Sequence, residues 1–229
     1  MHKHRDVQDG TARAAVFGIS DGLVSNVSLI LGIAGASTDP SIIRIAGISG
    51  LLAGAVSMAA GEYVSLQAQK ELVERELLIE RKSIDTNLED ETEELKSIYE
   101  ERGLDPDLAE EVARQIMSNS EIALEVHIRE ELGVNPEQLG SPILAAGSSF
   151  VSFSFGAFVP LVPWLLGEGN AAIWVSAISG IMCTALVGGV LARLSGRSII
   201  KTSLRQMSVA AAACSATYLI GSFLGTSIV

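Results

Sequence analysis

One acidic side chain, Asp21, lies inside an apolar stretch that is otherwise uncharged between residues 14 and 36. An ionised side chain at membrane depth costs roughly 2.5 to 3.5 kcal/mol on insertion scales. Such residues usually face a protein interior or water, and they mark the path of an ion or a polar substrate. Asp21 therefore indicates a transporter, provided that the rest of the chain also belongs in a membrane.

Two side chains of the next apolar stretch could share a site with Asp21. Met58 and Glu62 are four residues apart and so lie on one face of a helix. Helical rise places Asp21 and Met58 roughly 10 Å, and Glu62 roughly 5 Å, from the same membrane surface. Two carboxylates and a thioether could together coordinate a transition metal. The alternatives are that Met58 is ordinary membrane core and that Glu62 snorkels to the interface.

A second group of metal-binding residue types follows in an acidic segment. Glu91 and Glu94 are three residues apart, and His127 and Glu131 are four apart, so each pair shares a helix face. Together with Glu80 they offer carboxylates and an imidazole, which suit Fe(II), Mn(II) or Zn(II). A solvated acidic helix produces the same spacing and stays open as the alternative.

Five apolar stretches, each of about 20 residues or more, must position these groups. They cover residues 14–36, 43–66, 143–167, 171–192 and 206–228. At 1.5 Å per residue, each is long enough to cross a hydrocarbon layer of roughly 30 Å. The sequence therefore predicts an all-α membrane protein with five transmembrane helices. Pro160 and Pro163 are expected to bend or break the third of these helices.

The net charge of −11 is concentrated in one segment. Residues 67–141 contain 21 Asp or Glu against eight Lys or Arg. An acidic surface repels phosphates and attracts cations, which argues against a nucleic acid partner. We predict three parts: residues 1–66 with the N-terminal tail and two transmembrane helices, 67–141 as an acidic helical metal-binding insert, and 142–229 with three transmembrane helices.

Local signals divide the insert into helices. Asn87 is a candidate N-cap, and Asp105 before Pro106 is typical of a helix start. The expected helices are a continuation of the second span to residue 84, then residues 88–101, a helix from residue 106, and residues 120–132. The third of these is expected to carry an apolar stripe of Leu108, Val112 and Ile116.

Basic residues at the ends of the spans indicate the orientation in the membrane. Lys3, Arg5 and Arg13 precede the first span, and the link from the third span to the fourth has no basic residue. The link from the fourth span to the fifth is expected to hold Arg193, Arg197, Lys201 and Arg205. The positive-inside rule then places the N-terminus and the acidic insert in the cytoplasm and the C-terminus outside.

The cysteines and the other histidines suggest no further motif. Cys183 and Cys214 lie in apolar stretches, where they resemble small core residues without a disulfide or a CxxC pair. His2 and His4 could bind metal or belong to a flexible N-terminal end.

The motifs around these sites resemble those of the vacuolar iron transporter family. In chain order they read RAAVFGISDGLVSN, AGAVSMAAGEYVS, a Glu-rich insert that ends in REELG, and FVPLVPW. The resemblance covers nearly the whole chain. It implies a homodimer of five-helix protomers that exports Fe(II), and often Mn(II), from the cytosol in exchange for protons, with the insert as a metal-binding domain.

The resemblance also implies roles for particular residues. Asp21 and Met58 match the transport site of the family. The metal-binding residues implied for the insert are Glu80, Glu91, Glu94 and Glu131.

The chain departs from the family pattern at three positions. Gly50 stands where well-studied relatives have a Glu, so Glu62 is expected to supply the second carboxylate of the membrane site. Ser83 stands where an ExxE pair would have its second Glu. His127 replaces a Met of some relatives and is expected to join the metal ligands.

The sequence thus predicts a proton-coupled exporter of Fe(II) or Mn(II) without a permanent cofactor, whose insert could also hold other divalent ions such as Zn(II). A carboxylate that exchanges a proton for an arriving cation would couple the two fluxes. A membrane-tethered di-iron carboxylate oxidase is a weaker alternative, because Leu124 precedes His127 where the Glu-x-x-His motif needs a Glu. A metal-sensing scaffold that transports nothing is the third hypothesis.

Overall fold

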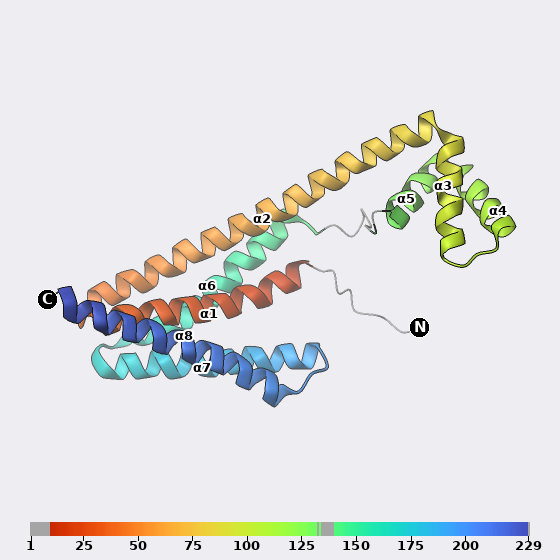
Figure 1. Cartoon of the computed structure of the whole chain (residues 1–229). Coiled ribbons are helices and arrows are strands. Elements are labelled where there is room, and N and C mark those ends of the chain that lie inside the picture. The colour runs from red at the N-terminus through yellow and green to blue at the C-terminus, as the bar shows by residue number, and fades with distance from the viewer. Residues whose placement is uncertain (1–9, 132, 134–139, 229) are drawn as a thin grey trace. The chain divides into compact units, whose positions relative to one another are not determined.

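The computed structural model describes residues 10–131, 133 and 140–228 (Figure 1). Within these ranges the regular structure is entirely α-helical, as the sequence predicts. The helices are α1 (Gly10–Ala36), α2 (Pro40–Thr86), α3 (Leu88–Glu101), α4 (Pro106–Met117), α5 (Ser120–Glu131), α6 (Pro142–Leu166), α7 (Gly169–Leu194) and α8 (Ile199–Ile228). His2 and His4 lie outside the described residues.

Five of these helices are long and apolar enough to cross a membrane: α1, α2, α6, α7 and α8. The last of them begins at Ile199 rather than at residue 206, so Lys201 and Arg205 lie on the first turns of α8 and not in the link before it. The chain divides into two compact units. One contains the residues up to Ser65 together with those from Gly140 onward, and the other is Leu66–Leu139.

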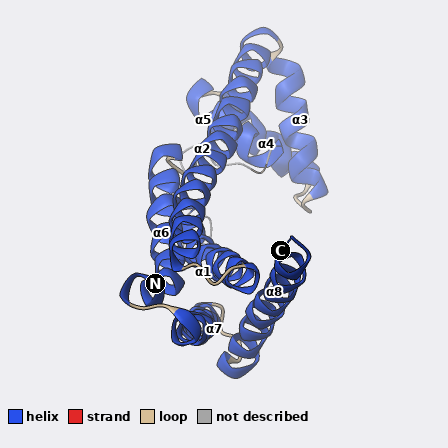
Figure 2. Ribbon diagram, turned by 90° about the vertical axis from the view of Figure 1, so that its left-hand side faces the viewer, coloured by secondary structure: helices blue, strands red, loops and turns tan. Residues whose placement is uncertain are grey.

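In the first unit, α1 packs against α6, α7 and α8 (Figure 2). Leu23, Val27 and Ile30 of α1 are almost completely buried. The backbones of α1 and α6 approach closely because glycine occupies the contact on both sides. A Cβ atom on Gly22 would collide with the carbonyl oxygen of Phe153, and one on Gly156 with that of Ile19. This close packing fixes the position of α1, the helix that carries Asp21.

Helix α6 continues through both of its internal prolines, so Pro160 and Pro163, which were expected to bend or break it, do not break it. Neighbouring side chains donate hydrogen bonds to carbonyl groups in this part of the helix. Ser176 Oγ donates to the carbonyl oxygen of Pro160 at 2.6 Å, and Arg44 Nε donates to that of Trp164 at 2.6 Å. These bonds tie the C-terminal half of α6 to α7 and α2.

The second unit consists of the C-terminal part of α2 with α3, α4 and α5 (Figure 1). The predicted bounds of α3 and the predicted start of α4 are confirmed, and the Asp105 carboxylate caps α4 by accepting from the amide of Asp107. Asn87 occupies the N-cap position of α3, although its side chain makes no capping hydrogen bond. The core combines residues of all four helices: Ile84, Leu95, Ala113, Met117, Ala123, Leu124 and Ile128.

The predicted apolar stripe of α4 is wrong by one position. Leu108 is 50% exposed, and the buried residues of this helix are Ala109, Ala113 and Met117. The two alanines are fully buried, because small side chains let α4 lie close to its neighbours. Val112 and Ile116 remain half-buried beside this seam.

Candidate metal-binding sites

The first candidate site is a pocket within the first unit, between α1, α2 and α6. It brings together Asp21 and Met58, two of the three residues that the sequence assigns to a membrane site. The described residues that line it are Asp21, Ser25, Asn26, Leu29, Gly50, Gly54, Ser57, Met58 and Phe153. The pocket thus places one carboxylate and one thioether among small and polar side chains.

Glu62 is not among the described residues that line this pocket. It lies one helical turn beyond Met58 on α2 and is half-buried. Gly50, which stands at the position of the family's Glu, does line the pocket. A Cβ atom at Gly50 would lie 2.8 Å from Asn26 Oδ1 and would collide with Leu29 Cδ2.

Hydrogen bonds hold the polar side chains of the pocket in place. Ser25 Oγ donates to Asp21 Oδ1 at 2.9 Å, one helical turn away. Asn26 Nδ2 donates to the carbonyl oxygen of Ala157 on α6 at 2.6 Å. Asn26 is not among the site residues predicted from the sequence. The sequence signal that could have identified it is its strong polarity, because Asn26 follows Asp21 by five residues in the same apolar stretch.

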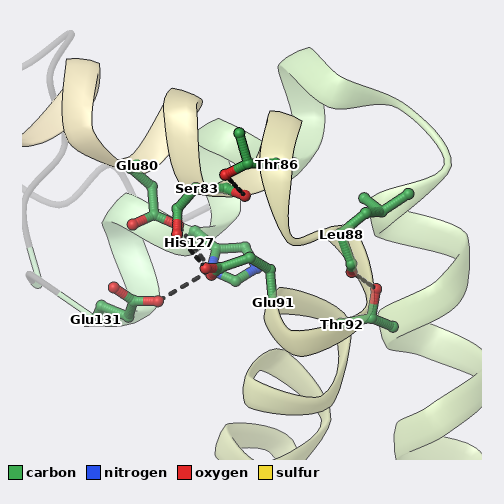
Figure 3. A network of polar contacts seen from close by, with 8 residues as sticks. All are labelled: Glu80, Ser83, Thr86, Leu88, Glu91, Thr92, His127 and Glu131. Atoms are coloured by element: carbon green, nitrogen blue, oxygen red, sulfur yellow. Dashed lines mark hydrogen bonds and ion pairs between the residues drawn. The ribbon is translucent and has the colours of Figure 1, made fainter.

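The second candidate site is a cluster of four side chains within the second unit, here called the His127 cluster. It consists of Glu80 from α2, Glu91 from α3, and His127 and Glu131 from α5 (Figure 3). One ligand atom from each residue lies within 4.8 Å of the others. Three carboxylates and one imidazole from three helices therefore converge on a space of the size that one metal ion needs.

The imidazole Nδ1 of His127 is the centre of this cluster. It lies 2.9 Å from Glu131 Oε1, 3.2 Å from Glu80 Oε1 and 3.7 Å from Glu91 Oε2. The His127 side chain is completely buried. In the tautomer that donates from Nδ1 to Glu131, Glu80 Oε1 is left buried without a hydrogen bond from any described residue.

The crowding of carboxylates changes their affinity for protons. Burial and the neighbouring charge of Glu131 raise the pKa of Glu80 to about 7, despite the opposing effect of His127. The pKa of Glu94 is also raised, by burial and then by Glu131 and Glu91. Glu94 is not among the four converging residues, although it shares their electrostatic environment. A cation would relieve the repulsion in this cluster and displace protons from it.

Ser83 supports the cluster from α2. Its Oγ donates to Glu91 Oε1 at 2.5 Å (Figure 3). This hydroxyl orients the Glu91 carboxylate so that its other oxygen, Oε2, faces His127. The position that departs from the ExxE pattern therefore contributes a hydrogen bond in place of a further negative charge.

A comparison with protein-family models matches residues 12–222 to the VIT family. The chain belongs to the VIT family. The match includes α2 to α7 entirely and most of α1 and α8, so both candidate sites lie inside it.

Curated relatives of this VIT-family chain carry consistent names. It is 36% identical over 225 residues to a vacuolar iron transporter of Acanthamoeba castellanii, which covers 96% of this chain and 81% of the relative. It is 27% identical over 207 residues to vacuolar iron transporter 2 of Oryza sativa subsp. japonica, covering 90% and 84%. Vacuolar iron transporter 1 of Arabidopsis thaliana is 25% identical over 209 residues, covering 91% and 84%.

Membership of the VIT family confirms two expectations from the sequence. The chain is an integral membrane protein, because five apolar helices of sufficient length accompany a family of transporters. It is not an enzyme, because the relatives are named as transporters. The hypothesis of a di-iron oxidase is therefore abandoned.

Proposed function

We propose that this protein is a transporter that moves Fe(II) or Mn(II) out of the cytosol in exchange for protons. The observation that carries the proposal is the pocket in which Asp21 and Met58 meet among membrane-spanning helices. Relatives named as iron transporters support the choice of metal. The positive-inside pattern of the sequence supports a cytoplasmic N-terminus and a cytoplasmic acidic insert.

The pocket has the chemistry expected of a passage site for a transition metal. Asp21 supplies the only carboxylate among its described lining residues, and Met58 supplies a thioether. A thioether is a soft ligand, which favours iron and other transition metals over Mg²⁺ and Ca²⁺. Glu62, one turn beyond Met58, is proposed to attract the ion toward the pocket.

The His127 cluster is proposed to bind the ion before transport. Its carboxylates and imidazole are ligands that suit Fe(II), Mn(II) and Zn(II). Glu94 adds negative charge near the four converging groups. The acidic insert would thereby raise the local concentration of divalent cations.

A homodimer is part of the proposal. The described residues of one chain leave much of the apolar surface of the spans exposed. In α2 and in α8, only 17% of the most apolar window is buried. A second copy would cover part of this surface, and lipid the remainder. Disulfide cross-linking of single-cysteine variants on α2 and α8 in native membranes would detect the dimer.

Reconstituted transport tests the central proposal. Purified protein in proteoliposomes is given Fe(II) under anaerobic conditions, Mn(II), Zn(II), Mg(II) or Ca(II), with and without an imposed pH gradient. We expect uptake of Fe(II) or Mn(II) that a gradient of the correct sign accelerates, with little uptake of Mg(II) or Ca(II). Uptake that ignores the pH gradient would refute proton exchange. Metal binding without any uptake would instead support the metal-sensing scaffold.

A further inference from the structure

Asn26 has a fixed orientation between α1 and α6. Its side chain is 98% buried, and Nδ2 donates to the carbonyl oxygen of Ala157 at 2.6 Å. A carbonyl oxygen only accepts hydrogen bonds, so the NH₂ end of the amide must be the end that faces α6. The amide oxygen, Oδ1, is consequently turned away from Ala157.

The Asn26 amide oxygen has no hydrogen-bond partner among the residues that the structure describes. It faces the backbone of Gly50, where an added Cβ atom would lie 2.8 Å from it. Asn26 and Gly50 both line the pocket that contains Asp21 and Met58. A buried acceptor without a partner is destabilising, and a cation in the adjoining pocket would satisfy this one.

We propose that Asn26 Oδ1 is a ligand of the transported divalent cation, beside the Asp21 carboxylate. This inference rests on the proposed transport function. An amide oxygen is a neutral, hard donor that divalent cations accept in place of water. Because Gly50 has no side chain, this oxygen borders the backbone of α2 at the wall of the pocket, where a Cβ atom would collide with Leu29 Cδ2.

A neutral second oxygen has a consequence for release of the ion. With Asp21 as the only carboxylate among the described lining residues, a bound divalent ion keeps a net positive charge. Its attraction to the site is therefore weaker than in a site with two carboxylates. Asn26 thus helps to replace the water that the ion loses, and it does so without the strong retention that a second carboxylate would cause.

A purely structural role is the competing explanation for Asn26. The bond to Ala157 joins α1 to α6 and accounts for Nδ2, but it leaves Oδ1 unexplained. Two substitutions separate the roles. Asn26→Ala removes both the bond and the oxygen, whereas Asn26→Asp loses the amide donor and keeps an oxygen that can bind metal.

Ser176→Ala is the matched control. Ser176 is completely buried and donates from its side chain to a carbonyl oxygen of α6, that of Pro160, at 2.6 Å. It is not among the described residues that line the pocket. The variant therefore loses the same kind of interhelical hydrogen bond at a place where no metal contact is proposed.

The experiment measures Mn(II) uptake into proteoliposomes over a range of concentrations, together with the melting temperature of each detergent-purified variant. We expect Asn26→Ala to raise the half-saturating Mn(II) concentration at least about tenfold, the scale on which groups at metal sites act. Asn26→Asp should leave it unchanged or lower it, because the added charge attracts the cation. Ser176→Ala should match the wild type in half-saturation while showing a lower melting temperature.

Four outcomes would refute either the ligand role of Asn26 or the proposed transport function. Equal weakening of uptake by Asn26→Ala and Asn26→Asp would establish the structural role and refute the ligand role. If Asn26→Ala fails to fold, the direction of the shift in Asn26→Asp decides the question alone, and a raised half-saturation refutes the ligand role. Failure of the wild-type protein to take up any metal would refute the proposed transport function. Wild-type uptake that Asn26→Ala leaves unchanged would refute only the ligand role of Asn26.

Discussion

Among the residues that the structure describes, the pocket lined by Asp21 offers a metal ion one carboxylate, whereas the His127 cluster offers three. The pocket combines this charge with a thioether and with the amide and hydroxyl groups of neighbouring residues. The cluster combines its carboxylates with a completely buried imidazole, and its ligand atoms already lie within 4.8 Å of one another. The two sites of one chain thus differ in charge, in softness and in how far they are assembled without metal.

This difference fits the proposed division between capture of an ion by the His127 cluster and its passage through the pocket. A site with several converging carboxylates binds a divalent cation strongly and releases it slowly, because binding removes their mutual repulsion. A transport site must bind the ion well enough for entry and weakly enough for exit. The charge of each site therefore suits the stage of transport that we assign to it.

The largest effect is expected from Asp21→Asn, which removes the only carboxylate among the described lining residues of the pocket. Fe(II) and Mn(II) uptake into proteoliposomes should fall to the level of protein-free vesicles, while metal binding by the insert persists. Glu168→Gln, which neutralises an exposed carboxylate between α6 and α7, is the control and should transport normally. Normal uptake by Asp21→Asn would exclude Asp21 from the mechanism.

A smaller effect is expected from His127→Leu, which removes the central imidazole and keeps a buried side chain of similar size. Mn(II) affinity of the intact protein should decrease about 10- to 100-fold, measured by titration calorimetry. The maximal uptake rate at saturating Mn(II) should change little, because the pocket is intact. Glu125→Gln on the exposed face of α5 is the control. Loss of maximal uptake as complete as in Asp21→Asn would show that the two sites do not divide the task as proposed.

Ser83→Ala should have a milder effect on the same cluster. The variant loses the 2.5 Å hydrogen bond that orients Glu91, while all four converging side chains remain. We expect Mn(II) affinity of the insert to fall by about tenfold or less. Ser97→Ala, on the same helix as Glu91, provides a comparison outside the cluster. A loss as large as that of His127→Leu would mean that Ser83 itself binds the ion.

The smallest effect concerns the pH dependence of the metal-free insert. The pKa of Glu80 is raised from 4.5 in the unfolded chain to about 7 in the fold, so the folded state holds its proton more tightly. Stability of the metal-free insert should therefore decrease as the pH rises from about 4.5 to about 7. Hydrogen exchange of α3 and α5, corrected for intrinsic rates, should show less protection at pH 8 than at pH 6.

Two additions make this pH experiment decisive. Mn(II) at pH 8 should restore the protection, because the cation replaces the lost proton. Glu80→Gln should reduce the pH dependence by removing the titrating carboxylate. An unchanged pH profile in that variant would show that another group is responsible.

Much of the fold follows from local signals in the sequence. Helix α3 begins directly after Asn87, the predicted N-cap position, and its end is followed by Gly103, whose positive φ of 94° other residues avoid. The buried face of α4 could not be predicted in the same way. Ala109 and Ala113 are less apolar than Leu108, yet both are fully buried, since small side chains let helices pack close together. Packing distance, which no single helix encodes, decides which face is buried.

The candidate sites show the same limit. Spacing predicts that Glu91 and Glu94 share a face of α3, but only the packing of α2, α3 and α5 determines that Glu91 joins the cluster. The pairing of Asp21 with Met58 could be predicted, because helical rise places both residues at a similar distance from the same membrane surface. Asn26 could not be assigned, because the partner that orients it, Ala157, lies on α6, far along the chain.

The packing of α1 against α6 and α8 also bears on how the protein is made. The ribosome completes α1 first, but the helices that bury it follow only after the whole of Leu66–Leu139 has been synthesised. Until then Asp21 and Asn26 are polar groups on a helix without its final neighbours, at a membrane depth where such groups are costly. The arrival of α6 gives Asn26 its hydrogen bond to Ala157 and contributes Phe153 to the pocket. Completion of the pocket that contains Asp21 is therefore a late step of biosynthesis.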